Sequence, residues 1–255
     1  MEPKEYHNLF ERERSNFWHV GRREILDETV GRFLRHEKKQ RILDIGCGTG
    51  GNYGLLSRYG EVVGVDYTEE ALKFASNAGF FSLIKASVDA LPLNDNSYDL
   101  VAALDVLEHV EDDAAALKEI FRVLRPGGFL LLTVPAYKFL WSDHDEVLHH
   151  FRRYGKKEIL TKLKIVQFEI VLHNRFVMLG VLERLVSKIK HLVFFKGRCS
   201  NLKKTHDLDA GVIINNLLLF SLRCEKYLMR FFHLPFGTSI LVVARKSRTY
   251  LDSNF

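Results

Sequence analysis

Short apolar runs alternate with helical segments through the middle of the chain. The apolar runs contain few polar positions, as expected of strands that are buried on both faces of a sheet. We expect such strands at residues 41–45, 62–66, 81–86, 98–105 and 128–135. Helical segments separate them, and the one at 112–124 repeats apolar residues at the spacing of a single helix face. Strands that alternate with helices predict a doubly wound α/β fold with a mostly parallel sheet.

The two ends of the chain follow other patterns. Residues 5–35 favour one or two helices, and a short helix is expected near 156–163. Strands are predicted at 164–173 and 236–246, which makes a sheet of about seven strands with the last one antiparallel. We divide the chain into three parts. Residues 1–35 form a helical lid, and residues 175–235 form a helical insert. Residues 36–174 and 236–247 together form the core.

Two amphipathic helices are expected in the 175–235 insert. The apolar positions of the first are Leu179, Leu182, Val186, Ile189 and Val193. The apolar positions of the second are Ile213, Leu217, Phe220, Cys224, Tyr227 and Phe231. Basic residues flank both stripes. Such a helix can lie in a membrane interface, pack on its own domain, or contact a second subunit as in a homodimer, and the sequence leaves these alternatives open.

Composition restricts the class of protein. The chain is 47% hydrophobic and 27% charged, as is typical of globular proteins. Its net charge of +5 is concentrated in the insert, where eleven Lys and Arg against four Asp and Glu give a local net of +7. This distribution argues against a uniform nucleic-acid-binding surface. Three cysteines without a CxxC pair, a charged N-terminal segment and no long uncharged apolar span favour a cytoplasmic protein, at most peripheral to a membrane.

The segment LDIGCGTGG at 43–51 predicts a strand that runs through a glycine turn into a helix. Small residues let the backbone approach a ligand, and free N–H groups at a helix start favour negative charge. Gly46, Gly48 and Gly51 have the spacing of dinucleotide-binding proteins, and Asp66 lies where a ribose-binding acid is expected. Asp44, however, adds a carboxylate that would repel a pyrophosphate and suits a ligand with an ammonium and a sulfonium group.

Five blocks in order resemble the class I S-adenosylmethionine-dependent methyltransferases, and among them the broad family of ubiquinone- and menaquinone-biosynthesis enzymes. The blocks are LDIGCGTGG (43–51), VVGVDYTEEAL (62–72), ASVDALPL (86–93), SYDLVAALDVLEHV (97–110) and FRVLRPGGFLLLTVP (121–135). The resemblance implies a Rossmann-like methyltransferase fold with S-adenosyl-L-methionine as the cofactor. Rival hypotheses are a nicotinamide-dependent oxidoreductase and a non-catalytic protein that binds S-adenosylmethionine.

The resemblance also implies cofactor-binding residues. Gly46, Cys47 and Gly48 would surround the methionine moiety and the ribose, with Asp44 ordering the turn. The remaining contacts would come from residues after later strands. These are Asp66 for the ribose hydroxyls, Tyr67 against the adenine, Asp89 and Ala90 at the adenine amino group, and the Leu104 carbonyl at the methionine ammonium.

The N-terminal segment 16–25 resembles a cofactor lid. Trp18 and Arg22 are four residues apart and so share a helix face. Arg22 would then pair with the methionine carboxylate. An aromatic residue that packs the helix on the sheet, with a surface arginine, is the structural alternative.

The acceptor is expected at the segment WSDHDEVLHHFRRYGKKEI (141–159), because ligands of open parallel sheets bind beyond the carboxyl ends of the strands. His150 or Tyr154 could act as a general base, as could His109 after the fourth strand. A metal held by His144, Asp145 and His149 or His150 is a second interpretation, and a structural clasp a third. We expect no metal, and a small-molecule, sugar or lipid-linked acceptor methylated on oxygen, nitrogen or carbon.

Overall fold

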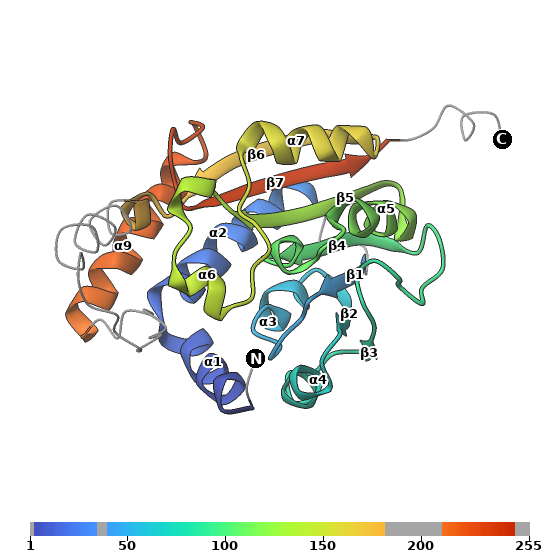
Figure 1. Cartoon of the computed structure of the whole chain (residues 1–255), viewed down its shortest axis with the longest axis horizontal. Coiled ribbons are helices and arrows are strands. Elements are labelled where there is room, and N and C mark those ends of the chain that lie inside the picture. The colour runs from blue at the N-terminus through green and yellow to red at the C-terminus, as the bar shows by residue number, and fades with distance from the viewer. Residues whose placement is uncertain (1–2, 35–39, 182–210, 248–255) are drawn as a thin grey trace.

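Seven strands form one sheet in the order β3-β2-β1-β4-β5-β7-β6 (Figure 1). The computed structural model describes residues 3–34, 40–181 and 211–247. The strands are β1 (Gln40–Ile45), β2 (Gly60–Asp66), β3 (Ser82–Lys85), β4 (Tyr98–Leu104), β5 (Leu124–Pro135), β6 (Phe168–Phe176) and β7 (Ser239–Lys246). The first five are mutually parallel, and β7 is antiparallel to both of its neighbours. The predicted fold class is confirmed.

The directions of the strands place the carboxyl ends of strands that are distant in sequence along one edge of the sheet. Because β7 runs antiparallel to both β5 and β6, β6 points the same way as β1 to β5. The carboxyl ends of β1, β2, β4, β5 and β6 therefore lie along the same edge of the sheet. In an open α/β sheet this is the edge at which ligands bind.

Helices cover both faces of the sheet (Figure 1). They are α1 (Pro3–Ser15), α2 (Phe17–Phe33), α3 (Tyr53–Leu56), α4 (Glu69–Ala75), α5 (Asp113–Val123), α6 (Asp143–Val147), α7 (Lys156–Ile165) and α9 (Val212–Leu228). Short 3-10 helices lie at η1 (Leu107–His109) and η2 (Lys138–Leu140). Leu117 and Ile120 of α5 and Ile159 of α7 pack on one face. The other face packs against α2, α3 and α9.

The N-terminal helix α2 is part of this core. Its Ile25 and Leu26 are buried against the sheet. Helix α9 packs on α2, and a Cβ at Gly21 would lie only 2.6 Å from Leu222 Cδ1. Glycine at this position therefore allows the two helices to approach closely.

Ion pairs join α9 to the outer side of α2. Arg223 lies 2.8 Å and Lys226 3.0 Å from the Glu24 carboxylate, and Arg230 lies 2.7 Å from Glu28. Hydrogen bonds from Arg223 and Arg230 lower the pKa of Glu24 and Glu28 respectively. The cations at the described end of the insert thus face α2.

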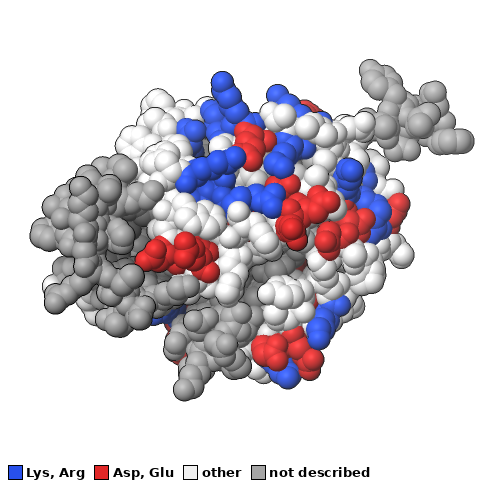
Figure 2. All heavy atoms as spheres, in the orientation of Figure 1, with Lys and Arg blue, Asp and Glu red and all other residues white. Residues whose placement is uncertain are grey.

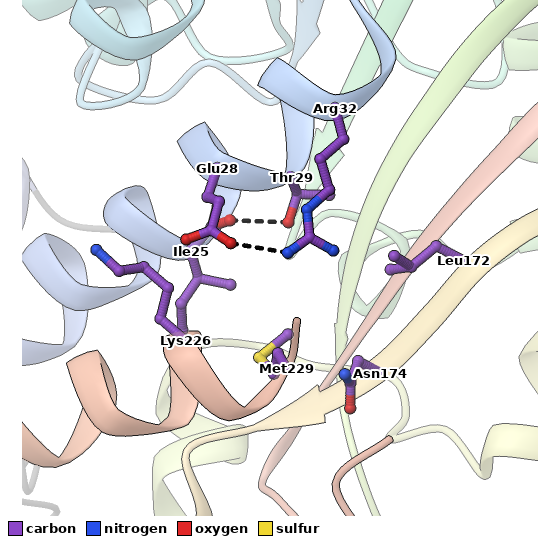
Figure 3. A pocket seen from close by; sticks show the side chains of 8 residues that line it. All are labelled: Ile25, Glu28, Thr29, Arg32, Leu172, Asn174, Lys226 and Met229. Carbon is purple, nitrogen blue, oxygen red and sulfur yellow. Dashed lines mark hydrogen bonds and ion pairs between the residues drawn. The ribbon is translucent and has the colours of Figure 1, made fainter. Parts of the chain in front are cut away.

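A small hollow lies beside these ion pairs, between α2, α9 and β6 (Figure 3). Glu28 and Arg32 pair with each other at its α2 side, at 2.8 Å. Leu172 and Asn174 approach from β6 and Met229 from the end of α9. The hollow belongs to the packing of α2 against α9 and lies away from the glycine turn.

The second predicted stripe of the insert faces outward. Its members Ile213, Leu217, Phe220, Tyr227 and Phe231 are all more than half exposed. The buried face of α9 instead carries Leu222 and Glu225. Most of the first predicted helix lies outside the described residues.

The starts of β6 and β5 differ most from the sequence expectations, by four residues each. Strand β6 begins at Phe168 because α7 continues to Ile165 and Gln167 adopts a positive φ of 71°. Strand β5 begins at Leu124, whereas the sequence pattern predicted its start at residue 128. Gly127 has a φ of 80°, and the pairing with β4 is irregular there.

Two leucines of α9 distinguish its packed face from its exposed face. Leu222→Ala should lower the free energy of unfolding by about 2–5 kcal/mol, the usual range for a buried leucine. Leu217→Ala, at a position that is 63% exposed, should change it by less than about 0.5 kcal/mol. Equilibrium denaturant unfolding measures both. Equal losses would mean that the outer face is buried in solution.

Candidate cofactor and acceptor site

The loop between β1 and α3 is a glycine turn with unusual backbone conformations. Gly46, Gly48 and Gly50 have φ values of 65°, 54° and 89°. At Gly46 a side chain would also collide, because a Cβ there would lie 2.6 Å from Cγ2 of Val106. The Cys47 N–H donates to the Val65 carbonyl at 3.0 Å and ties the turn to β2. Glycine is therefore required at Gly46 on both conformational and steric grounds.

Three carboxyl groups surround this turn. Asp66, at the end of β2, accepts hydrogen bonds from the Gly48 N–H at 3.1 Å and from the Thr68 N–H at 2.9 Å. Glu13 of α1 accepts a hydrogen bond from the Thr49 hydroxyl, and burial raises the pKa of Glu13. Asp44 is fully buried. The glycine turn is thus an acidic environment.

Asp44 is the least compensated of these groups. Within the described residues, neither of its carboxyl oxygens has a hydrogen-bond partner. Burial raises the pKa of Asp44 to about 7, although the nearby Arg22 acts in the opposite direction. Since Asp44 bonds no backbone group of the turn, the expected ordering of the loop through this side chain is not seen.

The carboxyl groups around the turn favour a positively charged ligand group over a negatively charged one. A dinucleotide would bring a doubly negative pyrophosphate to the start of α3, beside Glu13, Asp44 and Asp66. The negative charges of the pyrophosphate and of these carboxylates would repel each other. The repulsion is stronger in a buried site, where the dielectric constant is low. A ligand with an ammonium group could instead pair with Asp44, whose carboxyl oxygens have no hydrogen-bond partner among the described residues. This arrangement favours S-adenosylmethionine over a nicotinamide cofactor.

Arg22 reaches this site from α2. Its guanidinium lies 5.0 Å from the centre of the Trp18 ring, so the two side chains share a helix face as predicted. Its Nη2 atom lies 2.8 Å from Asp105, the residue after β4. Arg22 is only 6% exposed. A cofactor carboxylate at Arg22 would have to share the guanidinium with Asp105.

The other predicted cofactor residues lie at the same edge of the sheet but make fewer contacts. Tyr67 is 68% exposed, and Asp89 is exposed as well. The Ala90 N–H donates to the Ser87 carbonyl at 3.2 Å. Leu104 is the last residue of β4, and Asp105 follows it with a positive φ of 58°.

The segment 141–154 is organised around Asp145. Arg153 donates two hydrogen bonds to the Asp145 carboxylate, at 2.7 and 2.9 Å. The Ser142 N–H also donates to it at 2.9 Å, and His150 Nδ1 lies at the same distance. Burial alone would raise the pKa of Asp145, but the hydrogen bonds from His150 and Arg153 outweigh burial and hold this pKa below its usual value. Asp145 is therefore a fixed anionic centre that orients its neighbours.

Tyr154 is fully buried, in contrast to the position that a general base requires. Its hydroxyl contacts the Leu107 carbonyl at 3.1 Å and the Asp113 carboxylate at 2.9 Å. Burial, together with Asp113, raises the pKa of the hydroxyl. These contacts fit the clasp interpretation, in which Tyr154 fastens the segment to η1 and α5.

His150 and His109 lie together although they are distant in sequence. Their ring centres are 4.6 Å apart in an edge-to-face arrangement. Burial, followed by the charge of His150, lowers the pKa of His109 to about 4, so its imidazole is neutral at pH 7. Sequence reasoning treated the two histidines separately. It also missed Glu13, Asp105 and Asp113, for which the sequence carries no local signal.

Comparison with known proteins agrees with this site. Residues 43–132 match the family described as a methyltransferase domain. Demethylmenaquinone methyltransferase of Staphylococcus carnosus is 32% identical over 43% of this chain and 51% of its own length. Sterol 24-C-methyltransferase of Aspergillus fumigatus is 33% identical over 56% and 44%. The chain spans about half the length of these curated relatives.

Solved structures share the fold. A methyltransferase structure from Thermotoga maritima superposes with a TM-score of 0.59 at 17% identity, over 96% of both chains. Another from Archaeoglobus fulgidus gives 0.57 at 18% identity, over 94% of this chain and all of that chain. Sheet order, glycine turn and these likenesses together define a Rossmann-like methyltransferase fold. Residues 43–132 form a methyltransferase domain of the class I S-adenosylmethionine-dependent type, and S-adenosyl-L-methionine is the cofactor of that family.

The raised pKa of Asp44 makes stability depend on pH. Because the folded-state pKa of about 7 exceeds the usual aspartate value of about 3.9, folding favours the protonated carboxyl. The resulting stability is present at low pH and is lost as pH rises from about 4 to 7. Asp44→Asn removes this titration. The cofactor-free variant should match the wild type near pH 3.5, below the unfolded-state pKa, and melt at a higher temperature at pH 8. Equal destabilisation at both pH values would contradict the assignment.

Proposed function

We propose that the protein transfers the methyl group of S-adenosylmethionine to an apolar, lipid-like acceptor at a membrane surface. The acidic glycine turn carries the cofactor part of this proposal. An apolar hollow at the same edge of the sheet, with one buried carboxyl group, supports the acceptor part.

The residues of the glycine turn fit the cofactor. Asp66 is placed to accept the ribose hydroxyls, and Asp44 to face the methionine ammonium. Arg22 offers a guanidinium to the methionine carboxylate. When bound, the cofactor supplies a methyl group on a sulfonium. Such a transfer depends largely on alignment of the reacting atoms, so the main task of these side chains is to fix the cofactor beside the acceptor.

The acceptor hollow lies between the start of α2, the end of β6 and α9. Its lining is mostly apolar: Phe17, Val177, Leu179, Gly180, Leu218, Ser221, Leu222 and Glu225. Glu225 is 4% exposed, and burial raises its pKa. One carboxyl oxygen accepts the Met178 N–H at 2.9 Å, while the other has no partner among the described residues. An apolar molecule with one hydrogen-bonding group matches this lining.

Two relatives are named for lipidic acceptors, a sterol and demethylmenaquinone. This supports the same acceptor class here. The fold alone does not determine the reaction. The structure of a [4+2]-cyclase superposes on this chain with a TM-score of 0.56, so the same fold also occurs in a protein named for another reaction. A protein that binds S-adenosylmethionine without catalysis therefore stays the rival hypothesis, and turnover decides between them.

The outer face of α9 supports contact with a membrane. Five apolar or aromatic side chains along it are more than half exposed: Ile213, Leu217, Phe220, Tyr227 and Phe231. The neighbouring cations Arg223, Lys226 and Arg230 pair with α2. Aromatic and apolar side chains on one helix face insert into the boundary between headgroups and acyl chains. We choose a membrane over a second subunit because the acceptor hollow lies on the opposite side of this helix, so a lipid would be close to its site.

The visible surface gives no support to a nucleic-acid partner. On the face shown in Figure 2, Lys and Arg side chains lie among Asp and Glu side chains rather than forming a continuous basic surface. Among the described residues, no helix is both long and apolar enough to cross a membrane.

Asp66 tests the cofactor assignment. Asp66→Ala should weaken binding of S-adenosylhomocysteine about tenfold or more, because hydrogen bonds to a charged acceptor are worth about 1.5–3 kcal/mol each. Calorimetry measures the affinity. Glu70→Ala, at an exposed acid of α4, is the matched control and should bind normally. Unchanged affinity in a folded Asp66 variant would remove Asp66 from the site. Transfer of a radiolabelled methyl group to extracted membrane lipids then tests turnover.

The α9 face tests the membrane assignment. The double variant Leu217→Ser, Phe220→Ser should reduce co-sedimentation with lipid vesicles about tenfold, since each apolar side chain loses part of the roughly 1.5–3 kcal/mol of full burial. Asn216→Ser on the same helix is the control. Binding should rise with the content of anionic lipid and fall with added salt, because the insert carries a net charge of +7. A wild-type dimer that the double variant abolishes, without vesicle binding, would favour a subunit interface instead.

A further inference from the structure

Three side chains that commonly bind metals meet beside η1. Glu108 and His109 follow β4, and His150 comes from the 141–154 segment. One ligand atom from each lies within 4.8 Å of the others. Nitrogen and oxygen ligands lie about 2.0–2.2 Å from a tetrahedral zinc ion and so roughly 3.3 Å from one another, and side-chain rotations that bring the three atoms closer by about 1.5 Å would place them on one ion.

His150 is oriented as metal-binding histidines usually are. Its Nδ1 atom lies 2.9 Å from Asp145, which leaves Nε2 as the other ring nitrogen for a ligand. Arg153 holds Asp145 with two hydrogen bonds of 2.7 and 2.9 Å. A carboxylate behind a histidine fixes the tautomer and the ring orientation of a metal ligand. Asp145 is therefore placed to position a ligand rather than to be one.

Glu108 supplies an independent observation. It is 1% exposed, and its Oε2 atom has no hydrogen-bond partner among the described residues. A buried carboxylate oxygen without a partner is costly unless a cation completes it. The backbone of Glu108 is held in place, since its carbonyl accepts the Phe151 N–H at 2.7 Å.

We propose that Glu108, His109 and His150 bind one divalent transition-metal ion of the zinc type. Two imidazoles and one carboxylate are a donor set that suits zinc, iron(II) or cobalt(II) better than magnesium. Three protein ligands leave a coordination position for water. This set differs from the one considered from the sequence, because Asp145 lies behind His150 and the first ligand is Glu108.

The site adjoins the cofactor turn. Val106, two residues before Glu108, contacts Gly46, where a Cβ would lie 2.6 Å from it. The metal site does not depend on the proposed function.

Metal binding is tested without activity. The full chain, stripped with a chelator, is titrated with Co²⁺ and then with Zn²⁺. We expect one Co²⁺ per chain with visible absorption of a low-symmetry site, displaced by Zn²⁺ and not by equimolar Mg²⁺. The melting temperature should rise by about 5–10 °C at a hundredfold excess over the dissociation constant.

Variants assign the ligands. Glu108→Gln and His150→Gln should each weaken Co²⁺ binding at least tenfold, while His149→Gln, the adjacent histidine outside the cluster, should bind normally. Asp145→Asn should weaken binding by about 10–100-fold, as for other carboxylates behind metal-bound histidines. Circular dichroism and calorimetry with S-adenosylhomocysteine show that each variant folds. Absence of stoichiometric Co²⁺ or Zn²⁺ binding in wild-type protein that binds S-adenosylhomocysteine would overturn the metal site and leave the proposed function standing.

Discussion

The position of Arg22 among buried acids is the interaction on which the site depends. Its guanidinium bonds Asp105. Burial raises the pKa of both Asp44 and Glu108, and the charge of Arg22 partly opposes this rise. A buried charge is tolerated only when a partner compensates it. Because Arg22 comes from α2, this helix is bound to the carboxyl edge of the sheet by electrostatics as well as by its apolar face. The segment described from the sequence as a lid is thus also a structural part of the site.

The parts of the fold that could be predicted are those with a local signal. The central strands β1 and β4 are almost entirely buried, so their apolar runs identified them, whereas the edge strand β3 is only partly buried. Gly46 could be placed because the turn after β1 demands small residues. The pairing of residues could not be predicted. Tyr154 was a candidate base by composition, yet its role follows from Leu107 and Asp113, which reach it only through the packing of η1 and α5.

Helix α9 shows a second limit of sequence patterns. Its amphipathic stripe was predicted correctly, but a pattern does not say which side faces the protein. Here Gly21 admits Leu222, and Glu24 and Glu28 hold the cations of the same helix, so the more polar side packs inward. The apolar stripe therefore faces away from the domain. Exposure of this stripe to water costs free energy unless an apolar surface covers it, and the proposed membrane contact would provide such a surface.

The excess of carboxyl groups also links the two ligands proposed for the site. Asp44, with a pKa near 7, lies at the cofactor turn, and Glu108 lies at the metal cluster. A cationic ligand at either carboxyl favours its charged form and releases a proton when that form is not already populated. Binding of the cofactor ammonium at Asp44 should therefore strengthen as pH rises toward neutrality. The positive charge of Arg22 acts on both carboxyl groups. A cation bound at one of them neutralises that carboxylate, so the charge of Arg22 can then stabilise the other. The acidic pocket thus lets two positively charged groups bind close to each other despite their mutual repulsion.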